Sequence, residues 1–320
     1  MDGRLPAFAG ATGWLNTEPL TPDALDGKVV AVDFWTFTCI NWLRTLPCIR
    51  AWAKTYAAHG LVVIGVHTPE FSIEHDTDHV RRAAAAMSID YPIAIDNDYA
   101  IWDAFSNRYW PALYIADAAG RIQHHQFGEG GEDESEHTIR RLLADAGDRG
   151  LPPAPPRVVA HSIELAADWQ SLRSRETYLG LARSEGFASP ERPAFGEPRV
   201  YTVPSRLRVD EWALGGSWTV TSEDAACDEP NGRIVCRFHA RDLHLILAPA
   251  AQRASTRFRV LLDGRAPGDA HGADVDDEGH GVVDTPRLYQ VIRQSGHITE
   301  RQFEIEFLEP GASALCFTFG

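Results

Sequence analysis

The sequence of 320 residues has no hydrophobic run long enough to cross a bilayer and no excess of basic residues. Its apolar stretches at 28–35 and 61–66 fall far short of the roughly 20 residues that a membrane-spanning helix needs. The net charge of −15 argues against nucleic acid or an anionic membrane as partner. The N-terminus has an acid at position 2 and no basic patch before an apolar run, so we expect no secretory signal and a cytoplasmic location.

Cysteine is scarce as well, with five residues at positions 39, 48, 227, 236 and 316. No two of them are separated by two residues, so neither a zinc knuckle nor a disulfide scaffold is expected. The acidic run from Asp274 to Glu278 favours a solvated turn over a calcium site. We therefore predict no metal site and no cofactor.

Strand-like and helix-like segments alternate over residues 1–147, which is typical of an α/β domain whose central sheet is covered by helices. Apolar runs bounded by turn residues predict strands at 28–35, 61–67, 91–95, 112–116 and 122–127. Helical periodicity and end signals predict helices at 40–58, 76–87, 99–105 and 134–146.

A different pattern follows this domain. Residues 148–198 are expected to form a proline-rich linker with a partly helical segment at 161–186. From 199 to 320 short strands follow one another closely, and apolar and polar side chains alternate in several of them, as in 243–247. This spacing predicts an all-β sandwich of the jelly-roll type.

Cys39 stands where a buried strand breaks into a helix, in the stretch VDFWTFTCINWLRTLPC. A thiol at a helix N-terminus faces open backbone N–H groups and the positive end of the helix dipole, which stabilise the thiolate. The position past the carboxyl end of a strand is also where open α/β sheets place their sites. Cys39 is therefore the predicted nucleophile.

Several spacings agree around this cysteine. Asp33, in a strand ending Asp-Phe-Trp, lies six residues before Cys39, Pro47 lies eight residues after it, and Pro111 directly precedes a predicted strand. In these motifs the chain resembles the thioredoxin-like superfamily, in the TlpA and redoxin (AhpC/TSA-like) branch of DipZ-type proteins. The segment RLYQVIR and the terminal FTFG resemble the β module that follows in those proteins. The resemblance implies a cis bond at Pro111 facing Cys39, and Asp33 as a buried acid that exchanges a proton with the thiol.

One departure from the family changes the expected chemistry. Where the C-x-x-C motif has its second, resolving cysteine, this sequence has Trp42. Cys48 is no substitute, because nine residues of helix rise by about 13 Å and turn the two thiols to opposite sides. A disulfide needs Cα atoms within roughly 7 Å. The sequence predicts a monothiol site, whose mixed disulfide or sulfenic acid another molecule must resolve.

Three functions stay open from the sequence. The first is a thiol-disulfide oxidoreductase acting on a disulfide-bearing protein or a small thiol. The second is a peroxiredoxin-like thiol peroxidase acting on a peroxide, because Thr36 and Cys39 form T-x-x-C, although Val32 stands where that motif has proline. The third is a non-catalytic binding protein on a degenerate redoxin scaffold.

Several more side chains are candidates for contact with a substrate. Trp35 and Trp42 would form an aromatic platform beside the thiol, and a cis Pro111 would expose the backbone of Trp110 for pairing with a bound peptide. Other candidates around the rim are Thr36, Arg108, Arg44, His67 and Glu70. In the β module, Trp212, Trp218 and Tyr289 are candidate platforms for a carbohydrate, with a protein ligand as the alternative.

Overall fold

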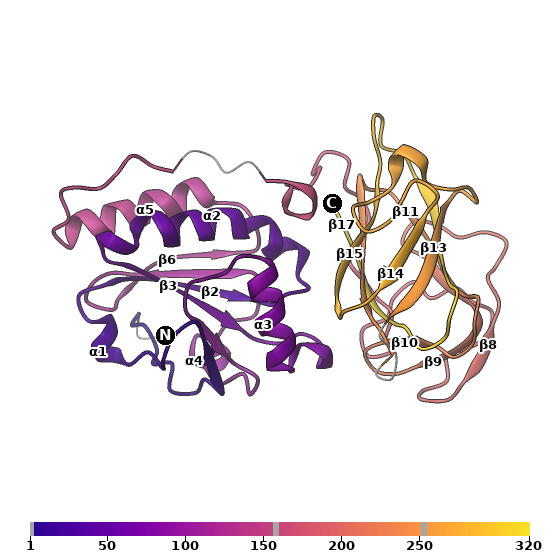
Figure 1. Cartoon of the computed structure of the whole chain (residues 1–320), viewed down its shortest axis with the longest axis horizontal. Helices are drawn as coiled ribbons and strands as arrows, with labels where there is room; N and C mark the ends of the chain where they lie inside the picture. The colour runs from indigo at the N-terminus through magenta and orange to yellow at the C-terminus, as the bar shows by residue number, and fades with distance from the viewer. Residues whose placement is uncertain (1–2, 156–159, 251–254) are drawn as a thin grey trace. The chain divides into compact units, whose positions relative to one another are not determined.

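The computed structural model describes residues 3–155, 160–250 and 255–320. The chain divides into two compact units, Met1–Leu165 and Ala166–Gly320, described separately here as the N-terminal and C-terminal domains (Figure 1). Part of the predicted proline-rich linker, residues 156–159, lies outside the described residues, as does the acid at position 2.

The N-terminal domain is built on a six-stranded mixed sheet in the order β1-β4-β3-β2-β5-β6. The central strands β2 and β3 are parallel, and β5 and β6 continue the sheet in antiparallel pairs. The strands are β1 (Gly13–Leu15), β2 (Val29–Trp35), β3 (Leu61–His67), β4 (Ile93–Ile95), β5 (Ala112–Ala116) and β6 (Ile122–Phe127).

Helices cover both faces of this sheet (Figure 1). Two long helices, α2 and α5, pack together on one face, and Ile101 and Phe105 at α4 join the apolar cluster on the other. The helices are α1 (Pro22–Leu25), α2 (Ile40–Tyr56), α3 (Thr77–Ala86), α4 (Ala100–Ala104) and α5 (Glu132–Asp145), with short 3-10 turns η1 (Ala57–His59) and η2 (Ser72–Glu74).

The register of β2 and β3 places the following loops at one edge of the sheet. All seven residues of β2 are buried, as a central strand requires, and the pairs run from Val29 with Leu61 to Trp35 with His67. The chain after Trp35 therefore emerges beside the chain after His67. After a short turn, the chain that follows Trp35 enters α2 at Ile40. The helical stretch formed by α2 and η1 ends at Gly60, whose φ of 93° suits glycine.

Residues 148–165 differ from the extended spacer that their prolines predict. Glu164, in the 3-10 turn η3 (Ser162–Glu164), accepts a hydrogen bond from Arg50 of α2 at 2.7 Å. Asp148 lies 2.6 Å from a ring nitrogen of His59. The described part of this segment therefore returns along α2.

The C-terminal domain is an antiparallel sandwich whose strands form one continuous path, β14-β13-β16-β11-β9-β10-β17-β12-β15. The long strand β9 belongs to both layers, and one large apolar cluster fills the space between them. The strands are β7 (Thr177–Tyr178), β8 (Arg199–Tyr201), β9 (Trp212–Val220), β10 (Ala225–Cys227), β11 (Gly232–Phe238), β12 (Asp242–Ala248), β13 (Thr256–Leu262), β14 (His280–Val283), β15 (Arg287–Arg293), β16 (Arg301–Phe307) and β17 (Ser313–Phe319). The sandwich is confirmed, and the jelly-roll connectivity stays a prediction.

The partly helical segment predicted at 161–186 takes another form. Its only helical turn in the described residues is η3, whereas β7 pairs with β17 and the amide of Leu179 donates to the carbonyl of Leu315 at 2.9 Å. Pairing with the sandwich satisfies the backbone groups that a helix would have satisfied internally. The second half of the predicted linker therefore belongs to the sandwich.

Candidate active site

Cys39 is the N-cap residue of α2, with an extended backbone at φ −75° and ψ 110°. Its amide donates to the carbonyl of Thr36 at 3.2 Å, and its carbonyl accepts from the amide of Leu43 at 3.0 Å. The tight turn after Trp35 thus sets the sulfur at the first turn of a 17-residue helix, with intermediate exposure. The helix dipole and a partly accessible sulfur are the two conditions for an activated thiolate.

Asp33 lies two residues before the end of β2 and is 1 % exposed. Its Oδ2 accepts a hydrogen bond from the indole Nε1 of Trp42 at 2.8 Å. Burial raises the pKa of Asp33 from its ordinary 3.8 to about 7, and the Trp42 bond opposes part of that rise because it stabilises the charged form. A carboxyl with such a pKa can both donate and accept a proton at neutral pH.

Trp35 and Trp42 do not form the substrate platform expected from the sequence. Both indoles are fully buried and stack on each other, with ring centroids 4.4 Å apart at an interplanar angle of 24°. Gly65 of β3 allows this packing, since a Cβ there would lie 2.8 Å from Nε1 of Trp35. The prediction failed because a strand residue and a helix residue near a thiol can face the core as well as the solvent.

The Trp110–Pro111 peptide bond is cis, as the resemblance implies. Phe34 pairs with Ala112 in antiparallel register, so Pro111 lies at the sheet edge where β2 ends and the chain turns toward Cys39. The indole of Trp110 is half-buried and donates to the carbonyl of Thr68 at 3.1 Å. Arg108 is exposed.

A second buried carboxyl, which was not predicted from the sequence, contacts the turn before Cys39. Glu74 in η2 is fully buried and accepts hydrogen bonds from the hydroxyl of Thr38 at 2.5 Å and the amide of Phe71 at 3.0 Å. Burial raises its pKa despite the hydrogen bond from Thr38. A glutamate three residues after the start of a turn is a capping signal that could have been read from the sequence. Its bond to Thr38 anchors the residue next to Cys39.

The expected rim residue His67 also lies in the interior. It is fully buried, with Trp35 edge-on at 4.8 Å and Phe37 stacked at 5.8 Å between ring centroids. Burial lowers the pKa of His67 to about 3, so the ring is neutral at physiological pH. Thr36 is fully buried too, which does not fit the peroxide contact that T-x-x-C predicts.

Arg44 is likewise buried rather than on the rim. Its guanidinium lies 2.9 Å from Oε1 of Glu129, in the loop between β6 and α5. The pair ties the first turns of α2 to that loop. Cys48 belongs to the same helix as Cys39, at intermediate exposure, which agrees with the predicted separation of the two thiols. In the described parts of the chain, no group of three or more potential ligand side chains could hold a metal ion.

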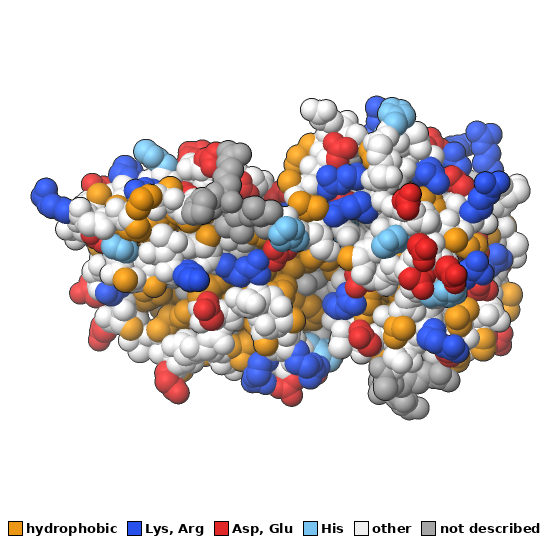
Figure 2. Space-filling model, turned by 45° about the horizontal axis from the view of Figure 1, so that its top comes forward, with side chains coloured by type: hydrophobic (Ala, Val, Ile, Leu, Met, Phe, Trp, Pro, Cys, Tyr) orange, Lys and Arg blue, Asp and Glu red, His pale blue; other side chains and the backbone are white. Residues whose placement is uncertain are grey.

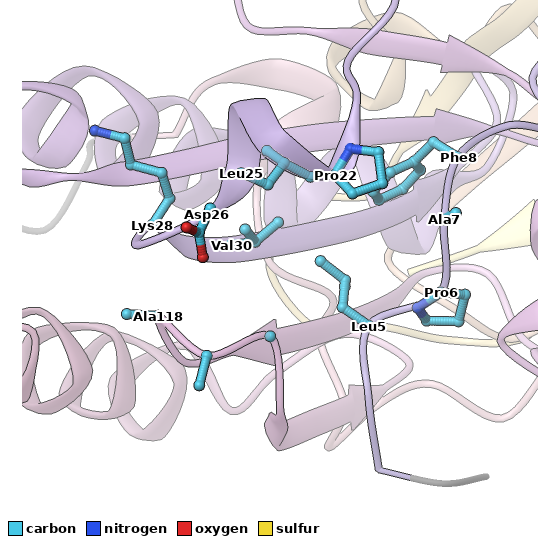
Figure 3. A pocket seen from close by; sticks show the side chains of 12 residues that line it. Leu5, Pro6, Ala7, Phe8, Pro22, Leu25, Asp26, Lys28, Val30 and Ala118 are labelled. Atoms are coloured by element: carbon cyan, nitrogen blue, oxygen red, sulfur yellow. The ribbon is translucent and has the colours of Figure 1, made fainter.

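A cavity of about 190 Å³ lies near the start of β2, at the other end of the strand from Cys39. Figure 3 shows its walls, which come from Leu5 to Phe8, from α1 and from the turn at Ala118. Among the described residues that line it, Asp26 and Lys28 are the charged ones. No motif of the sequence points to it.

Comparison with known proteins agrees with this geometry. Residues 3–125 match the family model described as AhpC/TSA family, and residues 174–320 match the model described as thioredoxin like C-terminal domain. Thiol-disulfide oxidoreductase YkuV of Bacillus subtilis is 31 % identical over 141 residues, which cover 44 % of this chain and 95 % of YkuV. The chain belongs to the redoxin branch of the thioredoxin-like superfamily.

The alignment of this redoxin with protein DipZ of Mycobacterium tuberculosis includes residues of both domains. It is 37 % identical over 248 residues, which cover 77 % of this chain, and the chain spans about a third of the length of DipZ, 35 %. Among solved structures, a thioredoxin-like protein in its oxidised form is 33 % identical and covers 45 % of this chain and 99 % of its own, with a TM-score of 0.42. The relative named as a thiol-disulfide oxidoreductase, YkuV, supports a thiol redox role.

The C-terminal domain of this redoxin does not present the aromatic platforms expected for a carbohydrate. Trp212, Trp218 and Tyr289 are at most 1 % exposed and belong to the apolar core of the sandwich. They occupy strand positions whose side chains face the core, and the sequence spacing alone did not distinguish these positions from outward-facing ones. Asp274, in the acidic run, forms an ion pair with Arg287 at 2.8 Å.

On the face shown in Figure 2, acidic and basic side chains are interspersed over both domains. No helix in the described ranges is long and apolar enough to cross a membrane.

Proposed function

We propose that this chain is a thiol-disulfide oxidoreductase with a monothiol active site, in which Cys39 is the nucleophile. The observation that carries the proposal is the position of Cys39 as N-cap of α2, four residues after Trp35, at which the buried strand β2 ends. The buried carboxyl of Asp33, with a pKa of about 7 and a hydrogen bond from Trp42 of the same helix, supports it. A disulfide-bearing protein is the proposed substrate, and the cytoplasm stays the predicted compartment.

The reaction follows from a single thiol. The Cys39 thiolate attacks one sulfur of a substrate disulfide, a bond forms between the two sulfurs, and the other substrate sulfur leaves with the electron pair of the broken bond. Asp33 supplies the proton that converts the departing thiolate to a thiol. Trp42 occupies the position of a resolving thiol, so a second, external thiol attacks the mixed disulfide. That thiol is oxidised into a new disulfide, its proton returns to Asp33, and Cys39 leaves as thiolate.

The experiment is the pH dependence of Cys39 alkylation by iodoacetamide, comparing the wild type with Cys39→Ser and Asp33→Asn. We expect Cys39 to titrate well below the ordinary thiol value of about 8.5. We also expect an inflection near pH 7 in the wild type that is absent in Asp33→Asn, because only the ionised carboxyl disfavours the nearby thiolate. An ordinary, unactivated thiol would instead favour the binding-protein alternative.

The peroxidase alternative is separated by a second readout. Dilute hydrogen peroxide and a small disulfide are offered to the reduced protein in parallel, and the modification of Cys39 is read by mass spectrometry. The oxidoreductase proposal expects the mixed disulfide to form much faster than the sulfenic acid, because Thr36, the threonine of T-x-x-C, is fully buried. Faster oxidation by peroxide would reverse this order and favour the peroxidase.

A further inference from the structure

The turn between β2 and α2 is buried as deeply as the strand before it. Thr36, Phe37 and Thr38 all lie in the interior, whereas Cys39 directly after them is partly accessible. Loops normally run over the protein surface, where their side chains meet solvent. A turn whose three side chains all face inward is held by its neighbours, and these contacts fix the place of the residue that follows.

Two such contacts reach the turn from β3 and from the loop after it. The ring of Phe37 stacks on His67, the last residue of β3, with centroids 5.8 Å apart at an interplanar angle of 14°. The hydroxyl of Thr38 donates to Oε1 of Glu74 at 2.5 Å. The ring contact is apolar, whereas the hydrogen bond fixes direction as well as distance.

The carboxyl of Glu74 is in turn fixed to the backbone of the loop after β3. Its Oε2 accepts from the amide of Glu70 at 2.6 Å and from the amide of Phe71 at 3.0 Å. One side-chain oxygen is thus bound by that loop and the other by the turn before Cys39. Because Glu74 is fully buried, bulk water cannot replace the Thr38 hydroxyl if that bond breaks.

The place of the turn decides how the sulfur of Cys39 meets α2. The amide of Cys39 donates to the carbonyl of Thr36, and its carbonyl accepts from the amide of Leu43, so Cys39 is the N-cap only while the turn keeps its shape. The stabilisation of a thiolate by a helix N-terminus falls off within the first turn. A displaced turn would therefore leave a less activated thiol.

We propose that Glu74 is a positioning residue for Cys39, which acts through Thr38 to hold the sulfur at the N-terminus of α2. The inference rests on the proposed oxidoreductase function, in which the Cys39 thiolate is the nucleophile, and adds the group that keeps this thiolate activated. Glu74 does so by joining the loops that follow β2 and β3, and it needs no contact with the substrate.

The first test is the apparent pKa of Cys39, from the pH dependence of its alkylation by iodoacetamide, read at Cys39 by peptide mapping. Thr38→Val removes the hydroxyl and keeps the branched shape, whereas Thr38→Ser keeps the hydroxyl. We expect the pKa of Cys39 to rise by about half to one pH unit in Thr38→Val and to stay close to the wild-type value in Thr38→Ser.

The matched control for this titration is Thr68→Val. It also removes a buried hydroxyl that donates to a carboxyl, that of Asp96 at 3.0 Å, but Thr68 lies in the neighbouring loop and outside the turn before Cys39. The pKa of Cys39 should stay at the wild-type value. A rise equal to that of Thr38→Val would show a general effect of lost buried hydrogen bonds and would overturn the positioning role.

The second test is amide hydrogen exchange in Thr38→Val, Glu74→Met and the double variant. We expect each single change to speed exchange about tenfold at the amides of Cys39 and Leu43, and to leave Trp52, later in α2, unchanged. The double variant should exchange no faster at these amides than Glu74→Met alone, because both changes remove the same bond. Faster exchange throughout α2 would indicate general destabilisation and would contradict the proposal.

The outcomes separate this inference from the proposed function. A lowered wild-type pKa of Cys39 that Thr38→Val leaves unchanged would overturn the role of Glu74 alone. An ordinary thiol pKa in the wild type would overturn both, because no activated thiolate would remain for Glu74 to hold.

Discussion

Asp33 combines deep burial with a single indole hydrogen bond, and the outcome is a carboxyl that titrates near neutrality. In water an aspartate is charged above about pH 4. Here burial raises the pKa to about 7, and the Trp42 N–H lowers it less than burial raises it. The side chain at the position of the resolving thiol, Trp42, is thus the hydrogen-bond partner of the acid that we propose serves Cys39.

The raised pKa of Asp33 predicts a pH-dependent stability difference. The unfolded chain loses this proton near pH 4, whereas the folded protein keeps it until about pH 7, so the folded state loses stability as pH rises through that interval. Asp33→Asn removes the titration. We expect it to gain up to about 4 kcal/mol relative to the wild type at pH 8 compared with pH 4. Urea denaturation at the two pH values measures this, and an equal difference at both would contradict the raised pKa.

Gly65 is predicted to be the least replaceable small residue of the site. Gly65→Ala places a methyl group 2.8 Å from Nε1 of Trp35, which must move out of its stack with Trp42. We expect a loss of about 1–3 kcal/mol of unfolding free energy. Gly13→Ala is the control, because its new Cβ would be 3.8 Å from the nearest atom. Chemical denaturation compares the two, and similar losses would show that close packing at Gly65 is not the cause.

For single residues the sequence predicted the burial and backbone geometry of the motif better than the orientation of the neighbouring side chains. Cys39, Asp33 and Pro111 follow from a motif with fixed spacings, and the structure confirms the burial of Asp33 and the cis bond at Pro111. Trp42 was expected in a substrate platform and lies in the core, stacked on Trp35, whose place in turn depends on Gly65 in the next strand, β3. A local sequence pattern does not predict such packing between separate segments.

Elements show the same division. β3 was predicted at its full length, and α2 with η1 covers the predicted 40–58, because buried strands and capped helices carry local signals. The helical reading of 161–186 was wrong because the apolar residues there pair with the sandwich, and the strands β7, β8 and β10 were too short to predict. Tertiary contacts decided these segments.

The attachment of η3 to α2 makes a prediction about Arg50. One end of its guanidinium donates to the carbonyl of Met87 at 2.6 Å and the other to Glu164 at 2.7 Å, both half-buried. Arg50→Met keeps the stem and removes both bonds, so we expect a loss of about 1–3 kcal/mol. Arg81→Met, which removes an exposed pair with Asp78, should cost close to nothing. Thermal denaturation of both variants makes the comparison, and equal shifts would contradict an anchored segment.

In the whole molecule, the candidate catalytic residues all lie in the N-terminal domain. The N-terminal domain has a partly exposed cysteine at the start of a helix, a buried acid and a cis-proline at one sheet edge. In the C-terminal domain Trp212, Trp218 and Tyr289 lie in the core, whereas Trp169 and Phe195 are exposed. The family models match each domain separately, at 3–125 and 174–320, which agrees with two independent cores.

The most direct test of the account is the intact mass of the reduced protein after reaction with oxidised glutathione at pH 7, for the wild type, Cys39→Ser and Cys48→Ser. We expect one glutathione adduct that maps to Cys39 in the wild type and in Cys48→Ser, persists without an added thiol, and is absent from Cys39→Ser. An adduct that remains in Cys39→Ser, or one that the wild type loses by forming an internal disulfide with Cys48, would contradict a monothiol site at Cys39.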